Sequence, residues 1–184
     1  TLIVSNTLTL ASPNLAFDLS AAPAGANDRI SMQGGRLAMS GVQNYLFTLT
    51  DNALGAGTYN LIEGATDSSA WSDVTHNLPS GTRQSFNIYR PAAGSNPSYV
   101  RLSVAGDAAS LVWNGGAGSA WDLNATTNWL NGATPSTFFN LDAVRLDDTA
   151  ANGTITIEGA VQPASVTVTN NIRAYILGGG ALSG

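Results

Sequence analysis

Short runs of alternating apolar and polar residues constrain this chain more than any other feature. Segments such as TLTL (7–10), NLAFDL (14–19) and RLSV (101–104) place apolar side chains on one face. Runs of this kind, ended by Gly, Asn, Asp or Pro, are typical of strands and turns. We find no apolar stripe of helical period with capping residues, and the alanines sit beside residues that break helices. The sequence therefore predicts an all-β protein with many short strands.

Composition narrows the range of partners. Charged residues are 10% of the chain, the formal net charge is −5, and all seven basic residues are Arg. An acidic chain is repelled by nucleic-acid phosphates, so we expect no nucleic-acid partner. No apolar run approaches the roughly 18 residues of a membrane helix, so we expect no membrane insertion by this segment. Without Cys, disulfides and thiolate metal sites are excluded.

Two architectures are compatible with many short strands, a β-sandwich and a β-solenoid. Turns rich in Asn, Gly, Ser and Thr, together with strands of only about 4–6 residues, favour the solenoid. Thr, Ser and Asn also occupy outward positions where charged residues are usual, and such side chains form hydrogen-bonded ladders between stacked strands. We expect a solenoid with open-ended rungs, and a β-sandwich is the alternative.

The chain divides near residue 110. We expect a solenoid block over 1–110 and a second block over 111–184 that continues the first. In the first block the strand pattern loosens over about 65–98, where we expect a protruding loop that joins strands at 57–65 and 83–90. Written end to end, AYILGGGALSG (174–184) and TLIVSNTLTL (1–10) form one uninterrupted strand–turn–strand pattern. This predicts one unit of a tandem array or filament, and a chain that is part of a longer protein.

The second block has a distinctive order of segments. They are LVWNGG (111–116), AWDLNATTNWLNG (120–132), FFNLDAVRLDD (138–148), GTITIEGAVQPASVTVTNN (153–171) and AYILGGGALSG (174–184). In order and spacing this block resembles the autotransporter-associated β-strand repeat of large bacterial surface proteins, with Leu146 where an aromatic residue is typical. The resemblance implies a right-handed parallel β-helix passenger, located on the bacterial cell surface or outside the cell.

The tryptophans of the second block are evenly spaced. Packing beneath turns is favoured over a sugar-stacking platform, because tryptophan side chains are usually buried and their indole N–H finds a nearby acceptor. Together with the alternating apolar positions that follow, they define a predicted structural core: Trp113, Trp121, Trp129, Phe139, Val144, Leu146, Ile155, Ile157, Val166 and Val168.

Both ends of the chain are uncharged strand-like segments. A terminal strand without a charged, proline or helical cap presents free backbone groups that recruit another strand. The sequence therefore predicts end-to-end self-association, in a surface fibre, stalk or adhesin. The residues assigned to these ends are Leu2, Val4, Leu8, Leu10, Tyr175, Leu177 and Leu182.

No motif supports catalysis, a cofactor or a metal site. His76 is the sole histidine, and no nucleophile elbow accompanies it. The acidic residues near 142–148 lack the spacing of a calcium loop, so turn formation is the favoured interpretation. Glu63, Asp67 and Asp73 are acidic but carry no glycosidase motif. We therefore predict a non-enzymatic protein without cofactors or metal ions.

Two other functions remain open at this point. The first is a carbohydrate-binding adhesin module, in which the loop over 65–98 and Trp71 contact a surface glycan. Exposed aromatic side chains in a groove would favour it. The second is a polysaccharide-processing β-helix enzyme, which requires carboxylates facing one another across a cleft.

Overall fold

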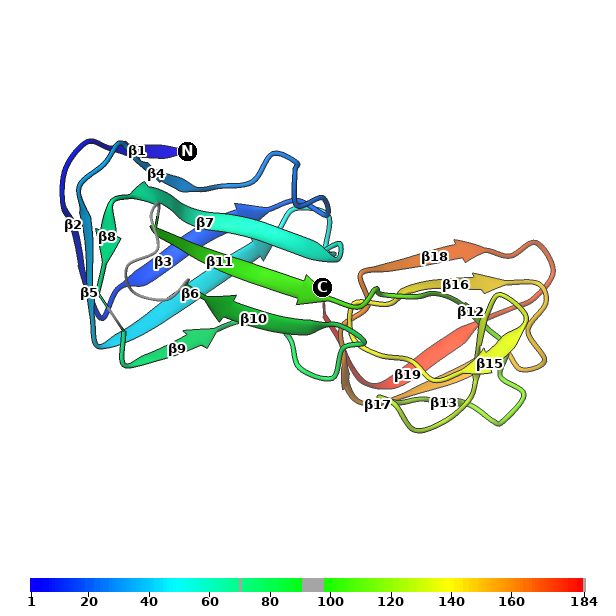
Figure 1. The fold of residues 1–184 in the computed structure, drawn as a ribbon. Helices are drawn as coiled ribbons and strands as arrows, with labels where there is room; N and C mark the ends of the chain where they lie inside the picture. Colours follow the sequence, from blue (N-terminus) through cyan, green and yellow to red (C-terminus); the bar gives the residue numbers. More distant parts are fainter. Residues whose placement is uncertain (70, 91–97, 184) are drawn as a thin grey trace. The chain divides into compact units, whose positions relative to one another are not determined.

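The structure, a computed structural model, describes residues 1–69, 71–90 and 98–183. These residues form strands, turns and loops and contain no helix, so the predicted all-β class is confirmed. The chain divides into two compact units (Figure 1). Unit 1 comprises Thr1–Leu78 and Ser85–Ala105, and unit 2 comprises Pro79–Gln84 and Gly106–Gly184. The division therefore falls after Ala105, five residues before the expected boundary at Ser110, and the segment 79–84 belongs with the second unit.

The described residues of unit 1 form eleven strands. They are β1 (Leu2–Val4), β2 (Leu8–Ala11), β3 (Asn14–Leu19), β4 (Ile30–Met32), β5 (Arg36–Ser40), β6 (Val42–Leu49), β7 (Gly57–Ala65), β8 (Asp67–Ser68), β9 (Asp73–His76), β10 (Ser85–Tyr89) and β11 (Ser98–Ala105). The first nine pair in parallel in the orders β1-β4-β7, β2-β5-β8 and β3-β6-β9. Each of the strands β1 to β6 thus pairs with the strand three places later, and Figure 1 shows β3, β6 and β9 as neighbours.

The register of these ladders places like residues opposite one another. Leu8 lies opposite Leu37, and Phe17 lies opposite Phe47. The rings of this last pair are 6.3 Å apart between centroids and lie in the core of unit 1. The alternation of apolar and polar residues is therefore in phase between paired strands. Apolar side chains of neighbouring strands lie side by side and form buried rows across each sheet.

The parallel pattern ends at β7. Here β11 pairs antiparallel with β7, and β10 pairs antiparallel with β11, so this sheet is mixed. The reversal places a hairpin where a fourth parallel strand would otherwise lie.

The protruding loop predicted over 65–98 is wrong for most of its described residues. Strands β8 and β9 lie there and pair within the sheets of unit 1, whereas β10 lies within 83–90, which the sequence also predicts to be a strand. Apolar and polar residues do not alternate regularly in this region, and polar side chains form some of the hydrogen bonds to the neighbouring backbone. Ser69 bonds both backbone groups of Met39, and Asn77 bonds both backbone groups of Phe47, each across 30 residues. Residues 91–97 lie outside the described part of the chain.

Unit 2 combines two parallel ladders with a hairpin. Its strands are β12 (Ser110–Trp113), β13 (Ala120–Trp121), β14 (Trp129–Asn131), β15 (Thr134–Ser136), β16 (Ala143–Asp147), β17 (Thr154–Val161), β18 (Ser165–Thr169) and β19 (Ile176–Leu182). The parallel orders are β12-β16-β18 and β13-β17-β19. The hairpin of β14 and β15 pairs antiparallel with the other edge of β12.

An aromatic cluster forms the core of unit 2. Trp113, Trp121 and Trp129 are fully buried, and Trp129 packs edge to face on each of the other two at 5.0 and 5.1 Å between ring centroids. The Trp113 indole donates a hydrogen bond to the backbone oxygen of Asn152 at 2.7 Å. The other core positions predicted from the sequence that are also buried are Val144, Leu146, Ile155 and Ile157, and Val166 is partly buried.

Two residues predicted for this core lie elsewhere. Phe138 is fully buried whereas Phe139 is only partly buried, because consecutive residues of an extended segment face opposite sides. The Arg83 guanidinium lies over the outward Phe139 ring at 4.5 Å. Val168 is 55% exposed, since it lies on β18, which has no further strand beside it among the described residues.

A buried ion pair fixes the segment 79–84 within unit 2. The Nε of Arg83 donates to both carboxylate oxygens of Asp142 at 2.9 and 3.0 Å, and the Asp142 side chain is fully buried. The same carboxylate accepts backbone N–H groups of Ala109 and Phe139 at 2.8 and 2.9 Å. This network satisfies the buried charge, as a charge removed from water requires.

Candidate functional site

Unit 1 ends in three free sheet edges. Each of β1, β2 and β3 is the first strand of its sheet and has a partner on one side only among residues 1–69, 71–90 and 98–183. We call these three strands the N-terminal edge. A strand at a sheet edge presents a row of N–H and C=O groups that another strand can bind. Here the three rows belong to β1, β2 and β3, which follow one another directly along the chain.

Unit 2 ends in two free sheet edges. Strands β18 and β19 are the last strands of its two parallel ladders, and among the described residues no further strand pairs with their outer sides. We call them and the turn between them the C-terminal edge. Both strands run parallel to their neighbours, so the free groups have the spacing of a parallel ladder.

Exposed large hydrophobic residues gather on these two edges. Of the ten in the described chain, seven lie there: Leu2, Ile3, Val168, Ile172, Ile176, Leu177 and Leu182. Ile172 is 90% and Ile176 is 68% exposed. Isolated exposed apolar residues are normal, but a concentration of them is typical of an interaction surface.

The residues predicted for self-association divide into two groups. Leu2, Leu177 and Leu182 are exposed on the edges. The others lie on or beside the edge strands but point at least partly inward: Val4, Leu8 and Tyr175 are partly buried, and Leu10 is buried in the core. The backbone of the second group belongs to the edge, whereas their side chains pack against the units.

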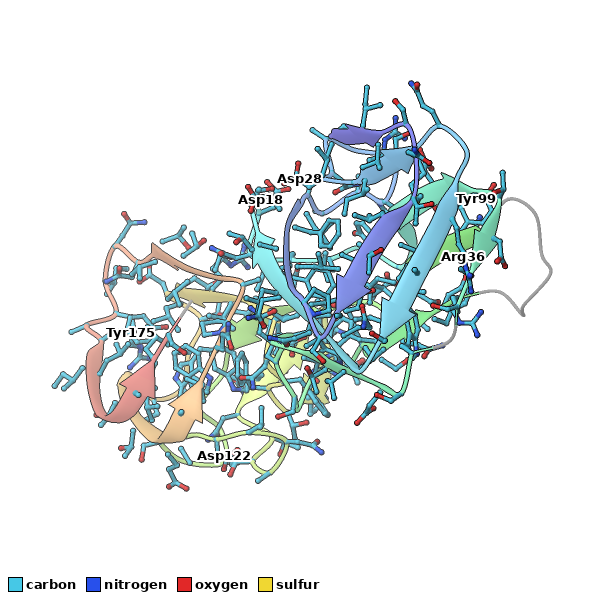
Figure 2. All side chains as sticks on the ribbon, turned by 90° about the vertical axis from the view of Figure 1, so that its left-hand side faces the viewer. Asp18, Asp28, Arg36, Tyr99, Asp122 and Tyr175 are labelled. Carbon is cyan, nitrogen blue, oxygen red and sulfur yellow. The ribbon has the colours of Figure 1, made fainter. Side chains whose placement is uncertain are left out.

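A hollow of about 280 Å³ opens at the N-terminal edge. Its lining combines the apolar residues Leu2, Leu15, Ala16, Phe17 and Ile30 with the polar and charged residues Asn14, Asp28 and Arg29. Asp28 lies close to Asp18, whose backbone N–H it accepts at 3.3 Å (Figure 2). The end of the apolar core is thus accessible from outside, beside a pair of carboxylates.

A ladder of polar side chains runs across the outer face of the sheet formed by β3, β6 and β9. The Asn44 amide donates to the Asn14 side-chain oxygen at 2.7 Å, and the Thr75 hydroxyl donates to the Asn44 oxygen at 2.9 Å. The row thus joins β3, β6 and β9 through side chains. Such ladders align strands in register. The row stops at Asn14, on the N-terminal edge.

A carboxylate holds the turn before β19. Asp148 accepts the backbone N–H groups of Asn171, Ile172 and Arg173 at 2.8–3.1 Å. These bonds, that of Arg173 foremost, hold the pKa of Asp148 below its ordinary value. The neighbouring Asp147 also has a lowered pKa, chiefly because the Thr149 hydroxyl donates to it. Its backbone oxygen accepts the hydroxyl of Tyr175, labelled in Figure 2.

The acidic residues considered for catalysis are engaged in pairs and turns. Glu63 and Asp67 form ion pairs with Arg29 and Arg36 at 3.1 and 3.4 Å, and Asp73 accepts the next backbone N–H. In the part of the chain described, no group of three or more His, Cys, Asp or Glu residues is arranged to hold a metal ion. No helix in that part is long and apolar enough to cross a membrane.

The aromatic residue considered for glycan contact packs into unit 1. Trp71 is partly buried and lies against the apolar core of that unit. His76 is exposed and meets the edge of the Phe86 ring at 6.5 Å.

Sequence reasoning missed two features. The Arg83–Asp142 pair joins residues 59 apart and has no local pattern. The Asn14–Asn44 pair has a signal, a repeat of 30 residues that also relates Ser69 to Met39 and Asn77 to Phe47. A search for polar residues at this spacing would have found it.

The chain was compared with protein families, curated proteins and solved structures. No family model, curated protein or solved structure matches it.

Proposed function

We propose that this chain is a non-enzymatic structural protein of the bacterial cell surface or extracellular space, a parallel β-solenoid whose ends associate into a fibre, stalk or adhesin. The observation that carries the proposal is the serial pairing in unit 1. Three sheets each take every third strand, in parallel and in register. This is the pairing expected when a chain winds in successive rungs that stack on one another.

The resemblance of residues 111–184 to the autotransporter-associated β-strand repeat supports the surface location and the right-handed coil. Its segments coincide with the strands of unit 2. LVW lies in β12, the Trp of W-D ends β13, and the Trp of N-W begins β14. The segment 138–148 contains β16, and the segment 153–171 contains β17 and β18. The order of the motif segments along the chain thus matches the order of the strands of unit 2.

The composition suits an extracellular filament. The chain contains no Lys and only seven Arg, and Arg90 precedes a proline, so a trypsin-like protease has few possible sites of cleavage. Most outward positions carry uncharged polar residues, and some of these pair across strands, as Asn14 and Asn44 do. Side-chain ladders of this kind add to the backbone bonds that hold strands in register.

The proposed mechanism is backbone pairing at the free edges. The N-terminal and C-terminal edges combine strands that are paired on one side only with exposed apolar side chains. An added strand gains backbone hydrogen bonds and buries apolar surface at about 25 cal/mol per Å². The partner is another unit of the same kind, either in tandem along one chain or in a second copy.

Concentration-dependent assembly tests the proposal. We expect the purified chain to form oligomers in analytical ultracentrifugation as its concentration rises, and aligned assemblies to diffract at a spacing of about 4.8 Å along the fibre. A chain that stays monomeric at every accessible concentration contradicts end-to-end association. Monomers that bind glycans on an array would instead support the adhesin module.

A further inference from the structure

The chain passes between the two units more than once. It leaves unit 1 after Leu78, lies in unit 2 over 79–84, returns to unit 1 over 85–105 and enters unit 2 again at Gly106. The strands of the return are β10 and β11, which pair antiparallel with each other. Unit 2 therefore contains the residues directly before β10 and directly after β11.

The segment 79–84 is bound to unit 2 along its length. The backbone oxygens of Ser80 and Gly81 accept hydrogen bonds from the side-chain amide and the backbone N–H of Asn140, each at 2.9 Å. Thr82 forms a parallel bridge with the same residue. The segment thus pairs with unit 2 through its backbone before the buried ion pair at Arg83 is reached.

The Arg83 side chain adds further bonds beside its ion pair with Asp142. Its Nη2 donates to the Ser136 hydroxyl at 3.0 Å and to the backbone oxygen of Thr137 at 2.6 Å. Hydrogen bonds from a charged donor are stronger than neutral ones, and those to a buried carboxylate are costly to break. The end of the segment that precedes β10 is therefore the most firmly held.

Gln84 and Gly106 close the base of the hairpin. The Gln84 amide donates to the backbone oxygen of Gly106 at 3.2 Å, next to the first hairpin pair of Ser85 and Ala105. Gly106 has a φ of 84°, and a Cβ there would lie 2.8 Å from the backbone oxygen of Arg83. The position therefore favours glycine for both its conformation and its space. We call 79–84 together with Gly106 the clasp.

The hairpin completes unit 1. Strand β11 pairs with β7 on the side where the parallel order ends, and β7, β11 and β10 lie side by side (Figure 1). The hairpin also supplies four residues to the core of unit 1: Ile88, Val100, Leu102 and Val104. A two-stranded hairpin is marginally stable alone, and bringing its ends together costs conformational entropy. A base that is already closed removes much of this cost.

We infer that unit 2 fixes the β10–β11 hairpin on β7 through the clasp. Loss of the clasp releases the hairpin, which frees the backbone groups along one side of β7 and uncovers part of the core of unit 1. The parallel ladders of β2 with β5 and β3 with β6 do not involve the hairpin and stay paired. The inference goes beyond the proposed function and does not depend on it.

Hydrogen exchange of the whole chain, followed by mass spectrometry, tests the inference. Arg83→Gln removes the bonds of the guanidinium to unit 2. We expect protection factors in β10 and β11 to fall by roughly tenfold or more, because local opening of the clasp now frees the hairpin. Those in β3 and β6 should change by less than about twofold. The matched control is Ile155→Ala, which truncates a buried residue of unit 2 and leaves every bond of the clasp in place.

Gly106→Ala repeats the test from the other end of the hairpin and leaves the Arg83–Asp142 pair intact. Its control is Gly132→Ala, since Gly132 also has a left-handed φ, of 60°, but has no other atoms within 4 Å of a Cβ. We expect the hairpin to lose protection in Gly106→Ala and to keep it in Gly132→Ala. This pair decides the question if Arg83→Gln does not fold.

Three results would overturn the inference. The first is an unchanged hairpin in both clasp variants while 79–84 itself loses protection. The second is an equal loss in the hairpin for the clasp variants and their controls, because the hairpin would then respond to the general stability of unit 2. The third is a loss of the same size in β3 and β6, which would mean that unit 1 opens as a whole. None of these results bears on end-to-end association, which is measured separately by ultracentrifugation.

Discussion

Units 1 and 2 stabilise parallel ladders in different ways. In unit 1, like residues repeat from strand to strand, so the core is built from rows such as Phe17 on Phe47 and Leu8 on Leu37. In unit 2, a cluster of edge-to-face aromatic rings fills the core, and the hairpin of β14 and β15 contributes Trp129 to it. Repeated rows spread stability along the ladder, whereas a cluster concentrates it in a few side chains.

The turns differ as well. In unit 1, neutral side chains such as those of Ser69 and Asn77 bond the backbone of the preceding turn of chain. In unit 2, the carboxylates of Asp142 and Asp148 have this role. The two units therefore respond differently to loss of a single side chain and to acid.

The largest expected effect comes from removing the centre of the aromatic cluster. Trp129→Ala leaves a cavity among Trp113, Trp121 and Phe138, and such truncations cost about 3–5 kcal/mol. We expect the free energy of unfolding of unit 2 to fall by this amount in urea titrations followed by tryptophan fluorescence. Trp129→Phe keeps part of the ring contacts and should cost less. Equal losses in the two variants would contradict a clustered core.

Breaking the buried ion pair should have the next largest effect. Arg83→Gln leaves the fully buried Asp142 carboxylate without its cation. Removing one partner of a buried pair typically costs about 3–5 kcal/mol, and the partial exposure of Arg83 places our expectation near 3. The double variant Arg83→Gln with Asp142→Asn removes the charge and should recover part of the loss in the same urea titration. No recovery would contradict an electrostatic origin.

A pair of tyrosines in unit 1 offers a smaller effect of opposite sign. The buried Tyr45 hydroxyl has no hydrogen-bond partner among the described residues, and burial raises its pKa. The Tyr59 hydroxyl donates to the backbone oxygen of Ala21 at 3.0 Å. We expect Tyr45→Phe to raise the free energy of unfolding of unit 1 by about 1 kcal/mol and Tyr59→Phe to lower it by about the same. Thermal melts of the two variants check this, and a loss in Tyr45→Phe would contradict an unsatisfied hydroxyl.

Much of this architecture could be predicted from the sequence, and the failures have physical causes. Alternation in segments such as 14–19 predicted strands, because burial of one face imposes a period of two. The same rule failed at 65–77, where Ser69 and Asn77 supply pairing through their side chains and apolar alternation is not required. At Phe138 and Phe139 the pattern could not decide between adjacent aromatic residues. The free edges could be predicted from the uncharged ends, whereas the hollow beside Phe17 depends on pairing that only the structure contains.

The smallest expected effect is on the acid stability of the turn before β19. The pKa of Asp148 is lowered in the folded state by the N–H groups of Arg173, Ile172 and Asn171. A lowered folded-state pKa means that the carboxylate stabilises the fold fully above its ordinary value of 3.8, and that this contribution is lost as pH falls through the lower folded value. The protection factors of these three amides, which correct for the intrinsic pH dependence of exchange, should therefore fall below about pH 4. In Asp148→Asn the amides should be less protected at neutral pH and show little further loss in acid. The Phe47 amide of unit 1, bonded to the neutral Asn77 side chain, serves as the internal reference. If the Asn171–Arg173 amides of the unmodified chain keep their protection relative to Phe47 down to pH 2, Asp148 does not hold this turn through its charge.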